Sequence, residues 1–333
     1  MLKIFIDIRP YRFLYYWCTY VYHVIGGSMS KNITFFQFQR KFSTNLRCYN
    51  YLFSQRWPDE FICPRCHHNK YSYHSTRGLY QCKNCHYQAS VTAGTIFHKT
   101  RTPLKIWFWM IFLISRNKTG SSLLYMMRLL EMNCYKTAWT MAHKIHKAMQ
   151  ENDQSTKLSG LIELDDAYFG ERNVTGKAGR GAARKKPVLI AVGTRVIKGK
   201  RKPSYLKMKV SSDMTKENVE EFVDNCISPG STIKTDKFKS YAFLNNKGYE
   251  HEAIRIYNPR ETLEYLPWVH IMIGNVKGIL KGVHHGVSPK HLQRFLSEFC
   301  YKFNRRFNEK RMFDNLVLAC INTKTVTFTE LRT

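Results

Sequence analysis

The sequence predicts a chain of mixed α/β class, in which helical and Cys-containing segments precede a domain built on a sheet. Apolar residues recur at helical spacing from 34 to 57 and from 106 to 149, whereas after 157 they come in short runs typical of buried strands. Two Cys-x-x-Cys pairs stand between the helical stretches. With 333 residues, 44% of them hydrophobic, the chain is long enough for two or three domains.

The charge of the chain favours a polyanionic partner. Lys and Arg number 53 against 24 Asp and Glu, and the formal net charge of +29 is spread along the sequence. Because phosphate neutralisation by such side chains supplies most non-specific affinity for nucleic acid, nucleic acid is the expected partner, and an anionic membrane surface is the alternative. Four of the ten Cys are clustered and six are scattered among apolar neighbours, which indicates an intracellular protein with reduced thiols and one metal site.

Residues 1–28 are an N-terminal extension of uncertain status. Residues 13–30 contain no Lys, Arg, Asp or Glu and include Gly26-Gly27-Ser28, a pattern that superficially resembles a signal peptide. The run is nevertheless rich in Tyr and lacks a long aliphatic block, so it is too polar for a membrane span. A start at Met29, with the upstream residues added by gene annotation, is the alternative. No membrane segment is expected.

The next two segments are expected to be a helical unit over 29–58 and a metal site over 59–98. Aromatic residues and Leu recur at spacings of three and four up to Trp57, which predicts two short amphipathic helices. Fifteen residues separate Cys66 from Cys82, and the four thiols of Cys63, Cys66, Cys82 and Cys85 can complete a tetrahedral Zn²⁺ site. The Tyr-rich stretch between the pairs favours the hairpin of a zinc ribbon. A redox pair is the alternative.

Segment 99–150 is expected to be helical and to bind DNA. The nine apolar residues 106–114 are too few to cross a bilayer and predict a buried helix. Two further helical patterns follow, and the second carries Lys136 and Lys144 away from its apolar face. Helix, short turn and basic helix are consistent with a helix-turn-helix that contacts DNA through these two Lys. An ordinary helical hairpin is the alternative.

Strand patterns begin after the polar linker 151–157. The run 161–170 reads as a buried strand with Asp165 at or near its end, and 231–236 as a strand that ends in Asp236. Burial of an ionised carboxylate is costly without a cation, so two acids on neighbouring strands predict a site for a pair of Mg²⁺ ions. A solvated acid on an edge strand is the alternative for Asp165. Successive strand residues point to opposite faces, so Asp166 is not expected to bind the same metal as Asp165 directly and is expected either to support the ligands or to be structural.

A basic stretch interrupts this part of the chain. Between residues 171 and 209 there are thirteen Lys or Arg and one acid, and a Gly-rich loop occupies 173–186. Such turns bring backbone and side chains within reach of phosphates. A solvated basic face is the alternative.

The order of these features resembles the ISXO-type insertion-sequence transposases, relatives of the eukaryotic Merlin elements. The resemblance covers about residues 30 to 318. Besides the Cys pairs and the two Asp, it rests on the blocks 88–95, 269–270, 274–277, 282–292 and 298–306, all in family order. It implies an RNase H-like catalytic domain over 158–320, a mixed sheet with flanking helices. Asp165, Asp236 and Asn275 would be its catalytic residues, with Asn where other subgroups have Glu.

What the resemblance implies is a DNA transposase, an enzyme that cuts the inverted-repeat ends of its element and joins them to target DNA. Asp165 and Asp236 would hold two Mg²⁺ or Mn²⁺ ions, and a homo-oligomer would assemble on the DNA. Lys277, Lys302 and Arg305 would neutralise phosphate charge. Other readings are a catalytically decayed or domesticated zinc-ribbon DNA-binding protein, and a structure-selective nuclease of the same fold. Either compartment that holds DNA, the bacterial nucleoid or the nucleus, is consistent with this reading.

The chain departs from the family pattern at two places. Asp166 stands where members usually have Glu, and His67 where they usually have Gly. Neither change removes a proposed ligand. An Asn at position 275 offers Mg²⁺ an uncharged oxygen, and His270 is a further candidate for the third ligand.

Overall fold

The computed structural model describes residues 33–170, 185–255, 261, 264–284 and 286–332. The chain divides into two units, one formed mainly by Thr156–Asn304 and the other by Asn32–Ser155 with Arg305–Thr333. The first is called unit 1 and the second unit 2. Within the described ranges, no helix combines the length and apolar character that crossing a membrane requires.

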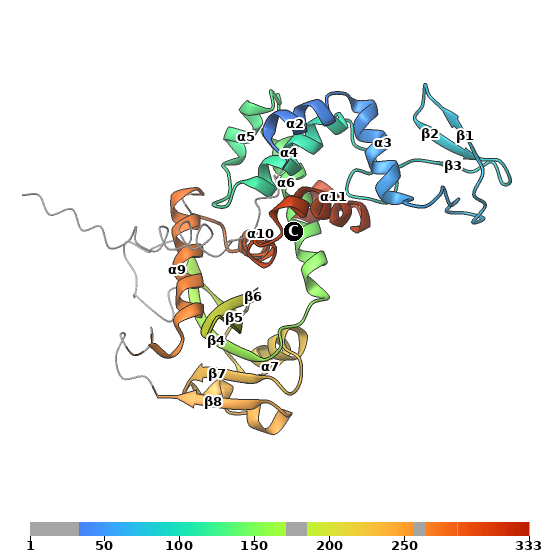
Figure 1. Ribbon diagram of the computed structural model, residues 1–333. Helices are drawn as coiled ribbons and strands as arrows, with labels where there is room; N and C mark the ends of the chain where they lie inside the picture. Colours follow the sequence, from blue (N-terminus) through green and yellow to red (C-terminus); the bar gives the residue numbers. More distant parts are fainter. Residues whose placement is uncertain (1–32, 171–184, 256–260, 262–263, 285, 333) are drawn as a thin grey trace, which may run out of the picture. The chain divides into compact units, whose positions relative to one another are not determined.

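Unit 1 is built on a five-stranded mixed sheet in the order β6-β5-β4-β7-β8 (Figure 1). Strands β4, β5 and β6 pair antiparallel, and β7 and β8 run parallel to β4. In sequence order this is the 3-2-1-4-5 arrangement of RNase H-like folds, so the predicted fold class is confirmed. The strands are β4 (Leu161–Gly170), β5 (Lys185–Ile197), β6 (Lys200–Val210), β7 (Thr232–Asp236) and β8 (Glu250–Ile254).

Helices cover both faces of this sheet. Apolar residues of α9 (Pro267–Gly282) and α10 (Leu292–Asn304) share one core cluster with Ala167 and Phe169 of β4. Residues of α7 (Lys216–Cys226) share the opposite cluster with Ile162 and Leu164. Because successive strand residues alternate between faces, the odd-numbered residues of β4 face α9 and the even-numbered ones face α7. Two short 3₁₀ turns, η1 (Lys239–Tyr241) and η2 (Leu244–Lys247), lie between β7 and β8.

Unit 2 is helical around an aromatic core. Phe38 stacks on Phe112 with ring centroids 4.1 Å apart, and Phe42, Phe108 and Phe313 pack around them. Aromatic pairs of this kind add to the stabilisation from burial. The helices are α2 (Phe35–Lys41), α3 (Asn45–Arg56), α4 (Leu104–Arg116), α5 (Leu123–Leu129), α6 (Tyr135–Gln154), η3 (Glu309–Arg311), α11 (Met312–Asn322) and α12 (Phe328–Arg332).

The C-terminal part of the chain divides differently from the expected boundary at residue 320. Unit 1 ends with α10 at Asn304, and α11 belongs to unit 2. The reason is the apolar face of α11, where Phe313, Leu316 and Cys320 are buried against α3, α4 and α6. The sequence pattern shows that α11 is amphipathic but does not say which unit buries its apolar face.

A three-stranded antiparallel ribbon follows α3 in unit 2. Its strands β1 (Tyr71–His74), β2 (Leu79–Cys82) and β3 (Gln88–Ala89) pair in that order. Every residue of β1 is exposed, so the ribbon has little apolar core of its own. Tyr80 is the centre of its packing, with the rings of Phe53, Phe61 and Tyr71 within 4.6–6.3 Å.

Candidate active site

Asp165 and Asp236 occupy equivalent positions on two neighbouring strands. The last parallel pair of β4 and β7 joins Glu163 to Lys234, and each Asp follows two residues later on its own strand. A shift of two residues keeps the face of the sheet, so both Asp lie on the face that α9 covers. The two acids that the sequence singled out are therefore brought side by side by the β4–β7 register.

The position of Asp165 within its strand differs from the expectation. Asp165 is in the middle of β4, because β5 continues to pair with β4 as far as Gly170. The pairing with β7, in contrast, stops at Glu163. Asp165 therefore lies where one neighbouring strand has ended and the other continues. It is 9% exposed, so its carboxylate is largely withdrawn from water. Asp236 is the last residue of β7, as expected.

The start of α9 is fixed to β4 by a buried carboxylate. Glu163 is fully buried, and its Oε2 accepts hydrogen bonds from the backbone N–H groups of Trp268 (2.8 Å) and Val269 (3.0 Å). N–H groups in the first turn of a helix have no partner inside the helix, so the carboxylate caps α9. Burial raises the pKa of Glu163 to about 7, although the two N–H groups and the nearby Arg201 lower it.

Sequence reasoning missed Glu163. It stands two residues before Asp165, on the same face, and an acid between two apolar neighbours was the signal that could have indicated it. Glu163 is a positioning residue in this structure, because it joins the strand that carries Asp165 to the helix that carries His270 and Asn275.

Two substitutions at Glu163 distinguish the contribution of its hydrogen-bond acceptor to stability from the contribution of its negative charge. Glu163→Ala leaves two buried N–H groups without an acceptor, so we expect the free energy of unfolding to fall by about 2–4 kcal/mol. Glu163→Gln keeps an oxygen for both bonds and is expected to lose less than half of that. Urea unfolding of both variants at one pH is the measurement. Equal losses in the two variants would show that the two hydrogen bonds do not hold α9.

His270 of α9 lies against Asp165. Its Nε2 is 3.3 Å from Asp165 Oδ2, although the angles are not those of a hydrogen bond. Burial lowers the pKa of His270, and the charge of Lys277 lowers it further. The imidazole is therefore neutral at pH 7, and its contact with Asp165 is not an ion pair.

Asn275 is the buried amide of this site. It lies in the interior of α9, away from both ends of the helix. The side chain is 5% exposed, and neither its oxygen nor its nitrogen has a hydrogen-bond partner among the described residues. An unsatisfied buried amide costs about 1–3 kcal/mol, so its retention calls for a ligand or a chemical role.

Lys277 brings a positive charge to the same face. Its Nζ lies 5.4 Å from the centre of the Phe169 ring on β4. Loss of water around the ammonium group lowers the pKa of Lys277, Lys185 lowers it further and Asp165 raises it, although much of the side chain is exposed. The electrostatic coupling to Asp165 places this cation near the candidate site.

The other cations proposed to contact DNA are engaged by the protein itself. Lys302 is buried and pairs with Glu298, and Arg305 pairs with Asp153. On α6, Lys144 Nζ donates to the carbonyl of Ile96 at 3.3 Å. The Lys136 ammonium lies 4.2 Å from the ring centre of Phe328. The helix-turn-helix role of α5 and α6 and the DNA contacts of these four cations stay predictions.

The four Cys of the ribbon converge as predicted. Their Sγ atoms all lie within 4.8 Å of one another, with Cys63 3.6 Å from Cys85 and Cys66 3.5 Å from Cys82. A tetrahedral zinc with Zn–S bonds of about 2.3 Å requires S–S distances of about 3.8 Å, so the set fits this ion. Both of these contacts run between the two Cys-x-x-Cys pairs, whereas a redox pair would close within one of them.

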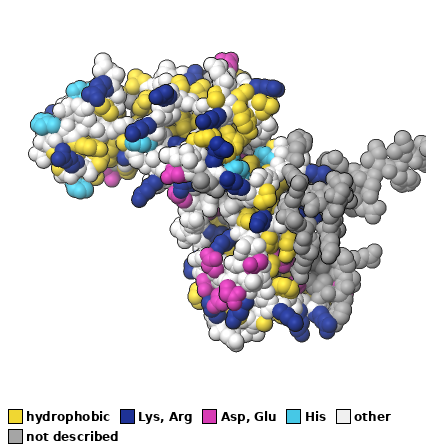
Figure 2. All heavy atoms as spheres, turned by 180° about the vertical axis from the view of Figure 1, so that it is seen from behind, with side chains coloured by type: hydrophobic (Ala, Val, Ile, Leu, Met, Phe, Trp, Pro, Cys, Tyr) yellow, Lys and Arg dark blue, Asp and Glu magenta, His cyan; other side chains and the backbone are white. Residues whose placement is uncertain are grey.

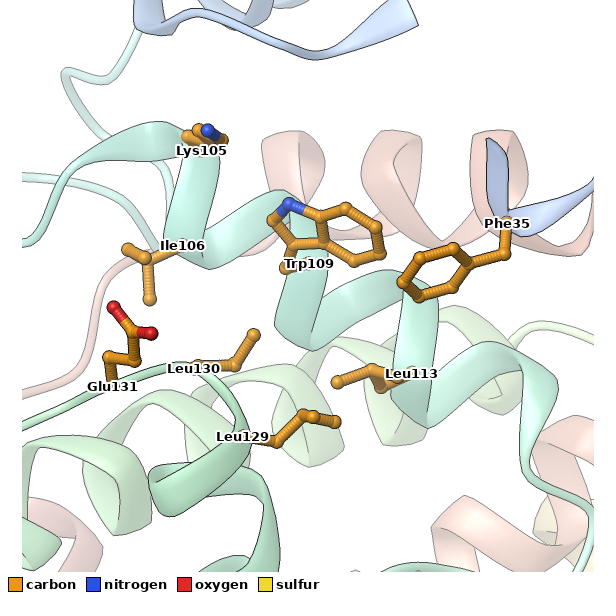
Figure 3. A pocket seen from close by; sticks show the side chains of 8 residues that line it. All are labelled: Phe35, Lys105, Ile106, Trp109, Leu113, Leu129, Leu130 and Glu131. Atoms are coloured by element: carbon orange, nitrogen blue, oxygen red, sulfur yellow. The ribbon is translucent and has the colours of Figure 1, made fainter. Parts of the chain in front are cut away.

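No second group of this kind exists among the described His, Cys, Asp and Glu residues. Unit 2 also holds a cavity of about 230 Å³ between α2, α4 and α5 (Figure 3). Apolar side chains, among them Phe35, Trp109 and Leu113, form most of its wall, so it does not offer the oxygen ligands that phosphoryl chemistry needs.

Comparisons with known proteins agree with the sequence and the fold. Residues 157–304 match the family described as the ISXO2-like transposase domain, and residues 43–88 match the transposase zinc-ribbon domain. No curated protein matches the chain significantly.

Two solved structures show weak similarity. One is a Mos1 transposase paired-end complex with the left transposon end (9% identity, 66% of this chain and 79% of that chain, TM-score 0.27). The other is a pre-cleavage Mos1 transpososome (9% identity, 64% and 78%, TM-score 0.26). A likeness this weak carries no argument. The two domain matches have the order that the sequence predicted, and they show that the chain contains an ISXO2-like transposase domain preceded by a transposase zinc-ribbon domain.

Proposed function

We propose that this chain cuts the ends of its own insertion sequence and joins them to target DNA by two-metal-ion phosphoryl transfer. The observation that carries the proposal is the placement of Asp165 and Asp236 on one face of adjacent strands, beneath the helix that buries the unpartnered amide of Asn275. The match to a transposase domain over the same residues supports it.

The residues present fit a pair of hard divalent cations. Asp165 and Asp236 would hold Mg²⁺ or Mn²⁺ through carboxylate oxygens, and Asn275 would add a neutral oxygen. Such ions lower the pKa of an attacking water or hydroxyl group and stabilise charge on the departing oxygen. His270, neutral and 3.3 Å from Asp165, is the alternative third ligand.

The chain's own groups position the DNA and balance its charge. In cleavage, a water oxygen bonds to the phosphorus and the bond to the 3′ oxygen breaks. In joining, the oxygen of the freed 3′ hydroxyl bonds to a phosphorus of the target, and the bond from that phosphorus to the target's own 3′ oxygen breaks, which leaves a target 3′ hydroxyl. Lys277, an exposed cation of α9, would neutralise phosphate charge at the site. The ribbon would bind one structural zinc through its four Cys and, with α6, recognise the element ends as part of a homo-oligomer.

Purified protein with DNA that carries the element ends tests the function. Mg²⁺ should produce nicks at the ends and joined products, and EDTA or scrambled ends should produce neither. Binding that depends on salt without any cleavage would instead indicate a decayed or domesticated DNA-binding protein. Cleavage of branched junctions regardless of the end sequence would indicate a structure-selective nuclease.

Asn275→Leu is expected to make the metal-free protein more stable and the enzyme less active. The substitution removes two unpaired buried polar atoms, so the free energy of unfolding in EDTA should rise by about 1–3 kcal/mol. Cleavage in Mg²⁺ should fall, because the site loses an oxygen ligand. Asn304→Leu is the matched control, since Asn304 makes two hydrogen bonds with the backbone of Leu206 and its loss should destabilise. A destabilised Asn275→Leu would contradict an unsatisfied amide.

A further inference from the structure

The hairpin of β5 and β6 ends in a two-stranded ribbon that extends past β4. Thr194 is the last residue of β5 with a partner on β4, and in the described sheet residues 195–197 pair with β6 alone. Lys198 and Gly199 form the turn, with φ angles of +52° and +71°. Positive φ at both central residues is typical of a type I′ turn, which makes a short, well-defined hairpin. Residues 195–202 are called the hairpin tip.

The hairpin tip is strongly basic. Five of its eight residues are cations and none is acidic, although one of the five, Arg201, reaches the Glu163 carboxylate at 4.0 Å: Arg195, Lys198, Lys200, Arg201 and Lys202. The register places Arg195 directly opposite Lys202, and like charges at opposed positions destabilise a strand pair. Arg195, Lys198 and Lys200 are exposed to solvent.

The backbone conformation of Lys198 in the turn also lowers stability. Lys198 is held at a positive φ, where Gly or Asn is less strained than a long side chain. A Lys at this place puts one more charge at the extreme end of the hairpin. Strain retained at a single residue is a feature often associated with a binding role.

Protection of an exposed sheet edge explains only part of this pattern. Lys residues on an edge strand such as β6 prevent pairing with another sheet. That reason does not apply to Arg195, which is on β5, or to Lys198, which is in the turn. The acids of unit 1 gather elsewhere, on α7 and β8, and Figure 2 shows acidic side chains together in the lower part of the view. The hairpin tip is thus a basic end of the domain.

We propose that the hairpin tip binds the phosphate backbone of duplex DNA at a distance from the candidate active site. Asp165 pairs with Ile190 of β5, and Lys198 follows eight residues later. At about 3.3 Å per residue the separation is roughly 26 Å, the length of roughly eight base pairs. Duplex is favoured over single-stranded nucleic acid because the tip has no aromatic side chain on which bases would stack. The inference deepens the proposed function, on which it rests for its substrate.

The test compares two variants of the full-length chain that each lose two exposed Lys. Lys198→Gly with Lys200→Gln alters the hairpin tip, and Lys216→Gln with Lys290→Gln is the control elsewhere on unit 1. Fluorescence anisotropy with a labelled duplex, over a series of salt concentrations without added Mg²⁺, gives the dissociation constants. We expect the tip variant to bind about tenfold more weakly, with the slope of log K against log salt reduced by about 2. The control should stay within about twofold of the parent.

The melting temperature separates binding from folding. Gly at position 198 relieves the strained turn, so the tip variant should melt at the same temperature as the parent or higher. Unchanged affinity and slope, or an equal loss in the control, would overturn the inference. A loss of binding to anionic lipid vesicles, with duplex binding retained, would overturn it in favour of a membrane surface.

Binding measured without Mg²⁺ also separates this inference from the proposed function. If the parent does not cut end-bearing DNA in Mg²⁺ but the tip variant still binds duplex more weakly, the transposase proposal is wrong. The inference that the hairpin tip binds duplex DNA is then still supported. If the parent cuts and the tip variant binds as tightly as the parent, the inference about the hairpin tip is wrong and the proposed function is unaffected.

Discussion

Asp165→Asn and Asp236→Asn are each expected to lower the rate of Mg²⁺-dependent cleavage by about 1,000-fold. Each substitution exchanges a charged metal ligand for a neutral amide of the same shape. Metal-ion catalysis supplies several kcal/mol of transition-state stabilisation, and about 4 kcal/mol corresponds to this factor. The measurement is single-turnover cleavage of DNA that carries the element ends, at saturating Mg²⁺ and protein.

Asp166→Asn is the matched control for this experiment. Asp166 is adjacent in sequence but points to the opposite face of the sheet, toward α7. We expect this variant to keep at least a tenth of the parent rate. DNA binding in EDTA should be similar in all three variants, so that a lost rate reports chemistry. Cleavage by Asp165→Asn at the parent rate would rule out the proposed site.

The sequence reveals the acids of this site but not the helix above them. Asp165 and Asp236 are visible because each interrupts or ends an apolar run, and an acid in such a run is costly. Their adjacency depends on the register of β4 against β7, which is a long-range property. The sequence around Asn275 does not single it out, because its position in the helical pattern of α9 is one that an ordinary core residue would also occupy. The resemblance to the family, not the periodicity, singled it out.

The partners of the Lys and Arg side chains can likewise be predicted from the sequence only when they are close along the chain. Lys302 and Glu298 are four residues apart on one helix, so their ion pair is readable from the sequence. The partners of Arg305 and Lys144, which are Asp153 and the carbonyl of Ile96, lie far away along the chain. A count of Lys and Arg therefore predicts a polyanionic partner without saying which charges are free to meet it.

Loss of zinc is expected to unfold the ribbon and leave the sheet of unit 1 intact. The ribbon has an exposed first strand and a packing centre of few aromatic rings, so its own burial cannot hold it. Structural zinc contributes about 10–16 kcal/mol of apparent binding free energy in small domains, and without it such domains are unfolded. Cys63→Ser, or a strong chelator on the parent, should therefore expose residues 59–98 to protease.

Two measurements decide this prediction. Metal analysis should find one zinc per chain in the parent and none in Cys63→Ser. Limited proteolysis should cut the variant within the ribbon while a fragment that contains unit 1 survives. Cys48→Ser is the control, because Cys48 is a buried thiol of α3 outside the four-Cys group and should keep its zinc. One zinc per chain and an uncut ribbon in Cys63→Ser would mean that three thiols with a flanking residue such as His67 suffice. The four-Cys assignment would then fall, because His67 lies beside the first Cys pair and has an imidazole able to bind zinc.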